Sequence, residues 1–76
     1  MEKLEISLNS IDKVKSFVSS IAPYDYDFDL SSGRYVIDAK SIMGIFSLDL
    51  SKPITLTIHA DNDMEAILKA VEPYRI

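Results

Sequence analysis

The sequence predicts an α+β fold in which a four-stranded antiparallel sheet carries three helices on one face, in the order βαββαβα. Three observations lead to this prediction. Several stretches alternate apolar and polar residues, the stretches between them place apolar residues at helical spacing, and glycine or proline stands near the changes of pattern. Strands and helices that each have one apolar face suit a two-layer, open-faced sandwich. At 76 residues, we expect a single domain over residues 1–76.

The first strand and the first helix are predicted from the opening residues. Leu4, Ile6 and Leu8 alternate with polar residues, as in a strand with one buried face. From Asn9 or Ser10 the spacing becomes helical, and both residues are good N-caps. The helix is expected to end at Pro23 and to bury a stripe made of Ile11, Val14, Phe17, Val18 and Ile21.

An acidic alternation follows over residues 24–30, and it predicts a strand with tyrosine, phenylalanine and leucine inward and three aspartates outward. Carboxylates at every second position also invite a calcium-loop interpretation. That loop needs glycine at its sixth position and glutamate at its twelfth, where this chain has Leu30 and Val36 counted from Asp25. We therefore expect no metal site, and a solvated face that discourages pairing at a sheet edge.

The middle of the chain predicts a hairpin and a short helix. Ser31-Ser32-Gly33 is expected to turn the chain into a strand over residues 34–39, with Tyr35, Ile37 and Ala39 on one face and Val36 on the other. A helix from Ser41 to Leu48 follows.

The last third predicts a loop, a strand and a helix. Ser51-Lys52-Pro53 is expected to be a loop, and residues 54–60 alternate as a half-buried strand. The final helix opens at residues 61–63, where Asn62 and Glu65 approximate a capping box, and Pro73 limits it. Its predicted buried stripe is Met64, Ile67, Leu68 and Val71.

Composition restricts the classes of function. Twelve acidic against eight basic residues give a net charge of −4, which disfavours nucleic acid as a partner. No apolar run approaches the length of a membrane span, and the first residues lack the pattern of a signal peptide. There is no cysteine, and the two glycines are too few for a nucleotide-binding loop. We expect a cytoplasmic protein without cofactor or membrane partner.

The stretch Asp38–Leu48 is the most distinctive part of the chain. Ser41 stands where a strand gives way to a helix, as an N-cap does. Ile45 and Leu48 can share a buried helix face, which leaves a neighbouring apolar face partly exposed. Exposed apolar residues indicate a partner, and we expect this patch to comprise Ile42, Met43 and Phe46.

These residues carry a family resemblance. Lys40-Ser41-Ile42-Met43-Gly44-Ile45, followed by Ser47-Leu48, resembles the regulatory-serine segment of HPr, the histidine-containing phosphocarrier of the bacterial sugar phosphotransferase system. The predicted order of elements matches that family over nearly the whole chain. The resemblance implies the HPr-like open-faced sandwich and a place among phosphotransferase-system proteins.

The phosphoryl acceptor of that family does not carry over to this chain. The family's histidine follows the first strand in a Gly-Leu-His-x-Arg-Pro-Ala type of loop, and the matching positions here hold Ser10, Asp12 and Lys13 for histidine, arginine and proline. A serine ester is too stable for a rapid, reversible relay, and Asp12 repels the phosphate that arginine attracts. We therefore predict a degenerate active site with no catalytic residue, and no enzyme.

Ser41 matches a serine that a dedicated kinase phosphorylates in low-GC Gram-positive members of the family, and the product binds a transcriptional regulator. Crh-like relatives lack the phosphohistidine and keep this serine, which this chain resembles. The resemblance makes Ser41 a candidate regulatory phosphorylation site, and Lys40 beside it could pair with the added charge. The alternative is that Ser41 is only an N-cap.

His59 is the one histidine, and by alternation it shares the polar side of its strand with Thr55 and Thr57. Nothing near it in sequence supplies an orienting carboxylate or a second metal ligand, so we interpret it as a surface residue.

Two main hypotheses remain. One is a non-catalytic HPr-like interaction module with Lys40, Ile42, Met43 and Phe46 as its contact patch. Its partner would be a kinase, a regulator or another phosphotransferase-system protein. The other is a phosphocarrier whose acceptor has moved to His59 or Ser10. A third is a fold used only for oligomerisation, and we expect a monomer or a weak homo-oligomer.

Overall fold

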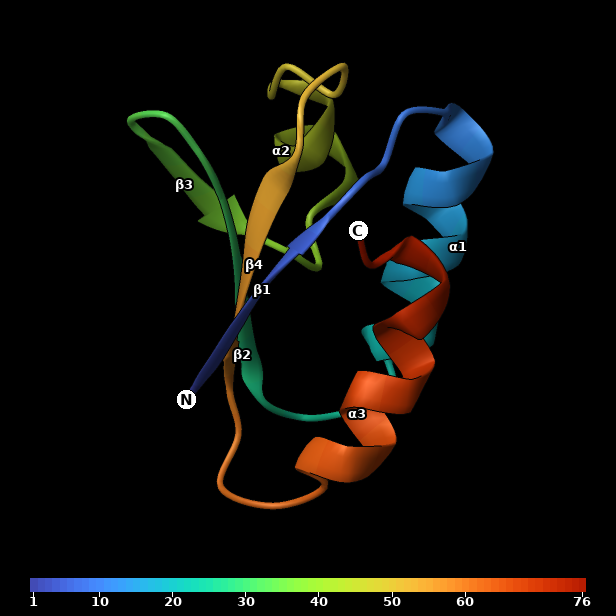
Figure 1. Ribbon diagram of the computed structural model, residues 1–76, viewed down its shortest axis with the longest axis vertical. Coiled ribbons are helices and arrows are strands. Elements are labelled where there is room, and N and C mark those ends of the chain that lie inside the picture. Colours follow the sequence, from blue (N-terminus) through green and yellow to red (C-terminus); the bar gives the residue numbers. More distant parts are fainter.

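The structure of the protein is a computed structural model that describes residues 1–76, and it has the predicted α+β architecture and element order. The four strands form one antiparallel sheet in the order β1-β4-β2-β3. Figure 1 shows α1 and α3 packed along one side of this sheet, while the other side carries no helix. The elements are β1 (Glu2–Ile6), α1 (Ile11–Ile21), β2 (Asp27–Ser32), β3 (Tyr35–Asp38), α2 (Ile42–Phe46), β4 (Ile54–His59), α3 (Met64–Val71) and a 3₁₀ turn (Glu72–Tyr74).

A single core of 18 residues lies between the sheet and the helices. The central strand β4 pairs with β1 and β2, so that Leu56 faces Leu4 on one side and Leu30 on the other. From the helices, Val14, Phe17 and Ile21 of α1 and Ile67 and Val71 of α3 enter the same core. Except for Ile11, the predicted inward residues of these helices are buried or packed against the core, because period 3.6 brings one apolar face to the layer interface.

The first strand is shorter than predicted because its partner strand begins after a proline. Ile6 faces Ile54, so the next pair along the ladder would join Ser7 to Pro53, which has no N–H to donate. Leu8 is therefore outside β1, although its side chain is fully buried.

Two aromatic residues predicted to lie inside a strand lie before it. Strand β2 starts at Asp27, so Tyr24 and Tyr26 belong to the preceding loop and are only partly buried against the core. Phe28 and Leu30 are buried as predicted. The alternation continues through the loop, but the ladder with β4 begins at the pair Asp27 and His59.

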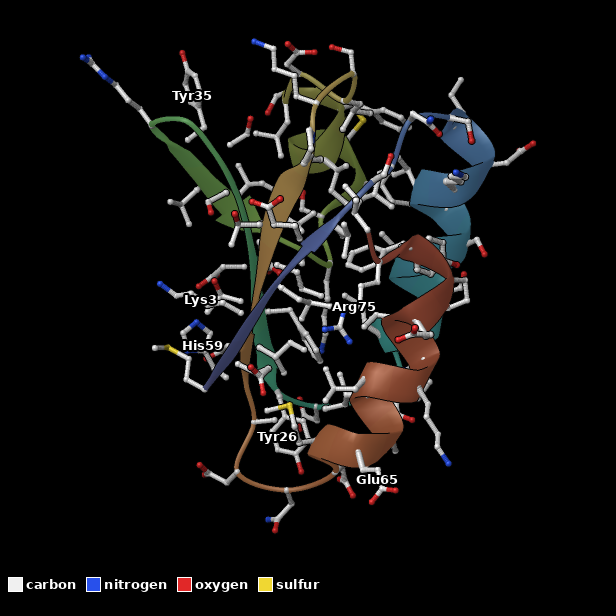
Figure 2. The ribbon with its side chains drawn as sticks, in the orientation of Figure 1. Lys3, Tyr26, Tyr35, His59, Glu65 and Arg75 are labelled. Atoms are coloured by element: carbon white, nitrogen blue, oxygen red, sulfur yellow. The ribbon has the colours of Figure 1, made fainter.

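Two further apolar residues are exposed, and for one of them, Ile11, the predicted burial was wrong. Ile11 was placed in the buried stripe of α1 but is 62% exposed. It is the first residue of the helix and directly follows the Ser10 cap. Tyr35, which the alternation places on the same face as Ile37 and Ala39, is 70% exposed, because it lies at the end of the β2–β3 hairpin (Figure 2).

The hairpin turn and the start of α3 also differ from the prediction. The turn is centred on Gly33 and Arg34, and the φ of +60° at Gly33 is one that glycine adopts without strain. Helix α3 starts after Asp63, which has φ 64° and makes no side-chain cap, so the predicted capping box of Asn62 and Glu65 does not form. The Asp63 carboxylate instead accepts a hydrogen bond from the Tyr26 hydroxyl, at 2.9 Å.

The carboxyl-terminal residues close one edge of the sheet. The Ser7 amide donates to the Tyr74 carbonyl at 2.8 Å, and the Ile76 amide donates to the Glu5 carbonyl at 3.1 Å. The Tyr74 hydroxyl also lies 2.6 Å from the Ser16 hydroxyl, which ties this segment to α1. None of the helices is both long and apolar enough to cross a membrane.

Candidate functional site

Ser10 is the N-cap of α1. Its φ of −149° is extended, its carbonyl accepts the first helical bond from Val14, and its hydroxyl oxygen accepts from the Lys13 amide at 3.1 Å. Asp12 follows in the first turn, where a carboxylate is stabilised by the positive end of the helix. The entrance of α1 therefore presents a capping hydroxyl and an acid, an arrangement that favours the helix and repels an anion.

Ser41 is the N-cap of α2, as predicted. Its hydroxyl oxygen accepts from the Gly44 amide at 3.1 Å, and its carbonyl accepts from the Ile45 amide at 3.0 Å. A Cβ placed on Gly44 would lie only 3.1 Å from that hydroxyl oxygen. Glycine at this position thus leaves the Ser41 side chain room to cap. Whether Ser41 is also phosphorylated stays a prediction.

The two faces of α2 divide as expected from the sequence. Ile45 is fully buried and Leu48 nearly so, while Met43 is 80% exposed and Ile42 and Phe46 are each more than one-third exposed. The exposed set lies beside the Ser41 cap, because it occupies the same five-residue helix. We call Ile42, Met43 and Phe46 the α2 patch. Its exposure is confirmed, and its role as a contact surface remains a prediction.

Lys40 does not lie open beside Ser41. Its Nζ donates to the Tyr24 carbonyl at 2.7 Å and stands 5.4 Å from the centroid of the Phe28 ring. The ammonium is therefore held against β2 and the preceding loop. Pairing with a phosphate on Ser41, or contact with a partner through the α2 patch, would require Lys40 to leave both of these interactions.

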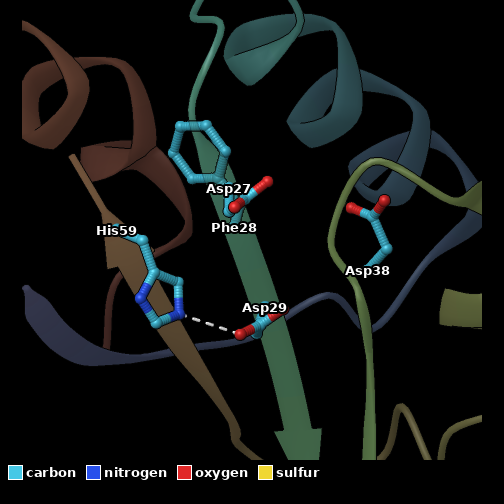
Figure 3. Close-up of a pocket in the computed structure, with 5 residues that line it drawn as sticks. All are labelled: Asp27, Phe28, Asp29, Asp38 and His59. Atoms are coloured by element: carbon cyan, nitrogen blue, oxygen red, sulfur yellow. Dashed lines mark hydrogen bonds and ion pairs between the residues drawn. The ribbon is translucent and has the colours of Figure 1, made fainter.

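His59 lies at the end of β4 and points away from the helices, to the open face of the sheet (Figure 2). Its Nε2 is 2.9 Å from Asp29 Oδ2 on β2. Asp27, Asp38 and Phe28 line the same shallow depression, as Figure 3 shows. The ring therefore has an orienting carboxylate after all. It comes from the neighbouring strand, which a search of residues near His59 in sequence could not find.

Three carboxylates give this depression an acidic character, yet no group of three or more histidine, cysteine or acidic side chains is arranged to hold a metal ion. The sequence analysis treated the aspartates as a solvated face and the histidine separately. The signal that joins them is the register, because Asp27 pairs with His59 and Asp29 lies two residues further along the same face.

The structure separates His59 from the two serine-capped helix starts. Ser10 begins α1, Ser41 begins α2, and His59 lies on the helix-free face. The fold therefore offers two serine-capped helix starts on an open-faced antiparallel sandwich, and the single histidine lies outside both of them.

Comparison with known proteins establishes the family. The family described as "PTS HPr component phosphorylation site" matches residues 13–74. This chain therefore belongs to the HPr family. The match starts at Lys13, so it leaves out Ser10 and Asp12.

Solved structures agree with this assignment. The phosphocarrier protein HPr from Bacillus anthracis is 27% identical, with a TM-score of 0.72 over 99% of this chain and 94% of that one. HPr-C-His from Thermoanaerobacter tengcongensis is 24% identical, with a TM-score of 0.79 over 96% of this chain and 89% of that one. A Mycoplasma histidine-containing phosphocarrier protein is 13% identical, with a TM-score of 0.75 over 95% of this chain and 89% of that one. The last two show the likeness of fold.

Proposed function

We propose that this chain is an HPr-family interaction module that does not carry a phosphoryl group on histidine. The observation that supports this most strongly is the entrance of α1. The residue there is Ser10, its hydroxyl caps the helix, and the chain's single histidine is in β4 on the open face of the sheet.

The chemistry of the α1 entrance supports the same conclusion. A phosphocarrier needs a nucleophile whose phosphoryl adduct is reactive enough to pass on, and a serine ester is not. It also needs positive charge to stabilise the transferred group, whereas this turn carries Asp12. A phosphoryl donor approaching Ser10 would meet a carboxylate where the family offers a guanidinium.

A phosphocarrier with a relocated acceptor is the alternative. Asp29 orients the ring of His59 through Nε2, while Nδ1 makes no hydrogen bond within the chain, and this feature favours the alternative. However, Asp27, Asp29 and Asp38 surround the same depression, and an incoming phosphoryl group carries negative charge. Electrostatic repulsion therefore weighs against His59, and the capping bond weighs against Ser10.

The proposed contact surface is the α2 patch, with Ser41 as its regulatory residue. A phosphate on Ser41 would add about −1.5 to −2 charges beside three exposed apolar side chains. It would thus change the charge of the surface a partner sees without reaching the core. The proposed partner is a protein of the phosphotransferase system, its serine kinase or a regulator, and binding needs no catalysis by this chain.

The experiment is incubation with phosphoenolpyruvate and the first phosphotransferase of the sugar phosphotransferase system, with Bacillus anthracis HPr as the positive control. We expect the control to gain acid-labile phosphate and this chain to gain none. Acid-labile phosphate that disappears in the variant His59→Ala would establish the relocated acceptor. Acid-stable phosphate that disappears in Ser10→Ala would place it on that hydroxyl.

A further inference from the structure

The two edges of the sheet differ, because a further segment of the chain is hydrogen-bonded to one edge strand and not to the other. On the β1 edge, Ile6 forms an antiparallel bridge with Arg75, and two backbone hydrogen bonds hold the carboxyl-terminal segment alongside the strand. The opposite edge is β3, which pairs with β2 only. Figure 1 shows β3 as the outermost strand. Two of its four residues, Tyr35 and Val36, are 70% and 64% exposed.

The backbone groups that β3 offers to solvent follow from its register. In an antiparallel ladder, every second residue directs its N–H and C=O to the same neighbouring strand. The Ala39 amide donates to the Phe28 carbonyl at 2.8 Å, so the odd-numbered residues face β2. Val36 and Asp38 therefore direct their N–H groups outward, away from β2. A sheet edge of this kind is a template for one more strand.

We propose that β3 pairs antiparallel with β3 of a second copy of this chain, about a two-fold axis at Val36. Such pairing joins two four-stranded sheets into one continuous sheet of eight strands, with the helices of both copies on the same face. The interface is isologous, so one strand supplies both sides of it. This inference does not depend on the proposed function, because it uses a different surface.

The side chains of β3 complement themselves in this register. Val36 faces Val36 of the second copy, and Tyr35 faces Ile37, so the exposed aromatic ring is covered by an apolar neighbour. Arg34, which precedes the strand, comes opposite Asp38 of the second copy, twice by symmetry. One oxygen of Asp38, Oδ1, accepts from the Lys40 amide at 2.9 Å, which leaves the other for the guanidinium.

Other registers lose this complementarity. An axis at Tyr35 places Arg34 opposite Val36 and leaves Asp38 without a charged neighbour, and an axis at Ile37 places Asp38 opposite Val36. Only the axis at Val36 pairs both charges and buries the tyrosine. Charge complementarity of a strand with itself is the reason to name a second copy, and not a foreign peptide, as the occupant.

The association is weak, because the edge is short. A four-residue strand buries much less than the roughly 1,000 Å² of a stable interface. We expect a reversible dimer that forms at protein concentrations of about 1 mM.

Amide spectra of the whole chain at about 20 μM and about 2 mM test this association. The amide signal of Val36 is expected to shift, and its hydrogen exchange to slow several-fold, on concentration. The hydrogen exchange of the Ile37 amide, which already faces β2, is expected to stay constant.

Charge reversal tests the register. The variants Arg34→Glu and Asp38→Lys each place like charges opposite one another, so each alone should lose the concentration dependence. Mixed together they should regain it, because every charge again faces its opposite. Lys15→Glu, an exposed lysine on α1, is the matched control and should associate like the parent chain. A Val36 signal that is independent of concentration, or variants that associate as the parent does, would overturn the proposal. So would a mixture that does not associate.

Discussion

Ser10 and Ser41 occupy the same local position in two different surroundings. Each hydroxyl oxygen accepts from the amide three residues on at 3.1 Å, and each begins a helix. Ser10 is followed by an eleven-residue helix with an acidic residue in its first turn. Ser41 is followed by a five-residue helix that has no acidic residue in its first turn and that carries exposed apolar side chains. A capping serine is thus not informative in itself. What separates a helix start from a candidate switch is the charge and the exposed surface that surround it.

The largest expected effect comes from rebuilding the α1 entrance. The double variant Ser10→His with Asp12→Arg restores the residue types of the family's acceptor, so we expect phosphoenolpyruvate-dependent, acid-labile phosphate to rise from none to a readily measured fraction of the chain. Intact mass spectrometry measures it. Ser41→His is the matched control at the other cap and should gain none. A rebuilt chain that stays unphosphorylated would show that more than these two residues has been lost.

The next effect concerns the other cap and its neighbours. An HPr serine kinase from a low-GC Gram-positive bacterium should phosphorylate Ser41, and Met43→Glu should lower kcat/KM about tenfold, which is a typical cost of losing a central apolar contact. Met43 is 80% exposed, so the change should leave thermal unfolding almost unaltered. Ile76→Glu, at a comparably exposed apolar residue outside the α2 patch, is the control. Equal rates for both variants would argue against the α2 patch.

Removing either cap should cost stability to a similar degree. Ser10→Ala and Ser41→Ala each leave one helical amide without its partner, and we expect a loss of about 1 kcal/mol in the free energy of unfolding. Urea denaturation measures this loss, and the dependence of the free energy of unfolding on urea concentration should stay unchanged. Ser19→Ala, at an exposed serine of α1 whose hydroxyl makes no hydrogen bond, should change stability very little. A loss at one cap only would show that the two bonds are not equivalent.

The smallest expected effect is on the pH dependence of stability, and it comes from the start of α3, which has no capping side chain. The hydrogen bond with the Asp63 carboxylate, followed by desolvation and nearby acidic charge, raises the pKa of the Tyr26 phenol above its ordinary value of 10.0. The raised pKa means that the folded chain holds this proton more tightly than the unfolded chain does. Its contribution to stability is therefore fully present below the ordinary phenol pKa and is lost as the pH rises from there through the raised pKa of the folded chain. Tyr26→Phe should flatten that part of the stability profile, and an unchanged profile would contradict the assignment.

Most of the fold could be predicted from alternation and helical spacing, and the residues that escaped prediction did so for tertiary reasons. The burial of Phe28, Leu56 and Ile67 could be predicted from the sequence pattern alone. Ile11 and Tyr35 fit the patterns of α1 and β3 but are the first residues of those elements, and both are exposed. Periodicity identifies a face without saying how far the covering layer extends.

The candidate sites were predictable in part. The Ser41 cap and the exposed patch follow from local spacing, and the structure has both. The bond between His59 and Asp29 joins residues thirty positions apart, and it depends on a strand register that local sequence does not specify. Lys40 looked free beside Ser41, but its ammonium reaches a carbonyl sixteen residues away.

The most direct test is the phosphate content of the unmodified chain after exposure to phosphoenolpyruvate and the first phosphotransferase. Our account predicts an unchanged mass under conditions in which an HPr with its histidine is fully labelled. A phosphorylated chain whose label is released by mild acid would contradict it.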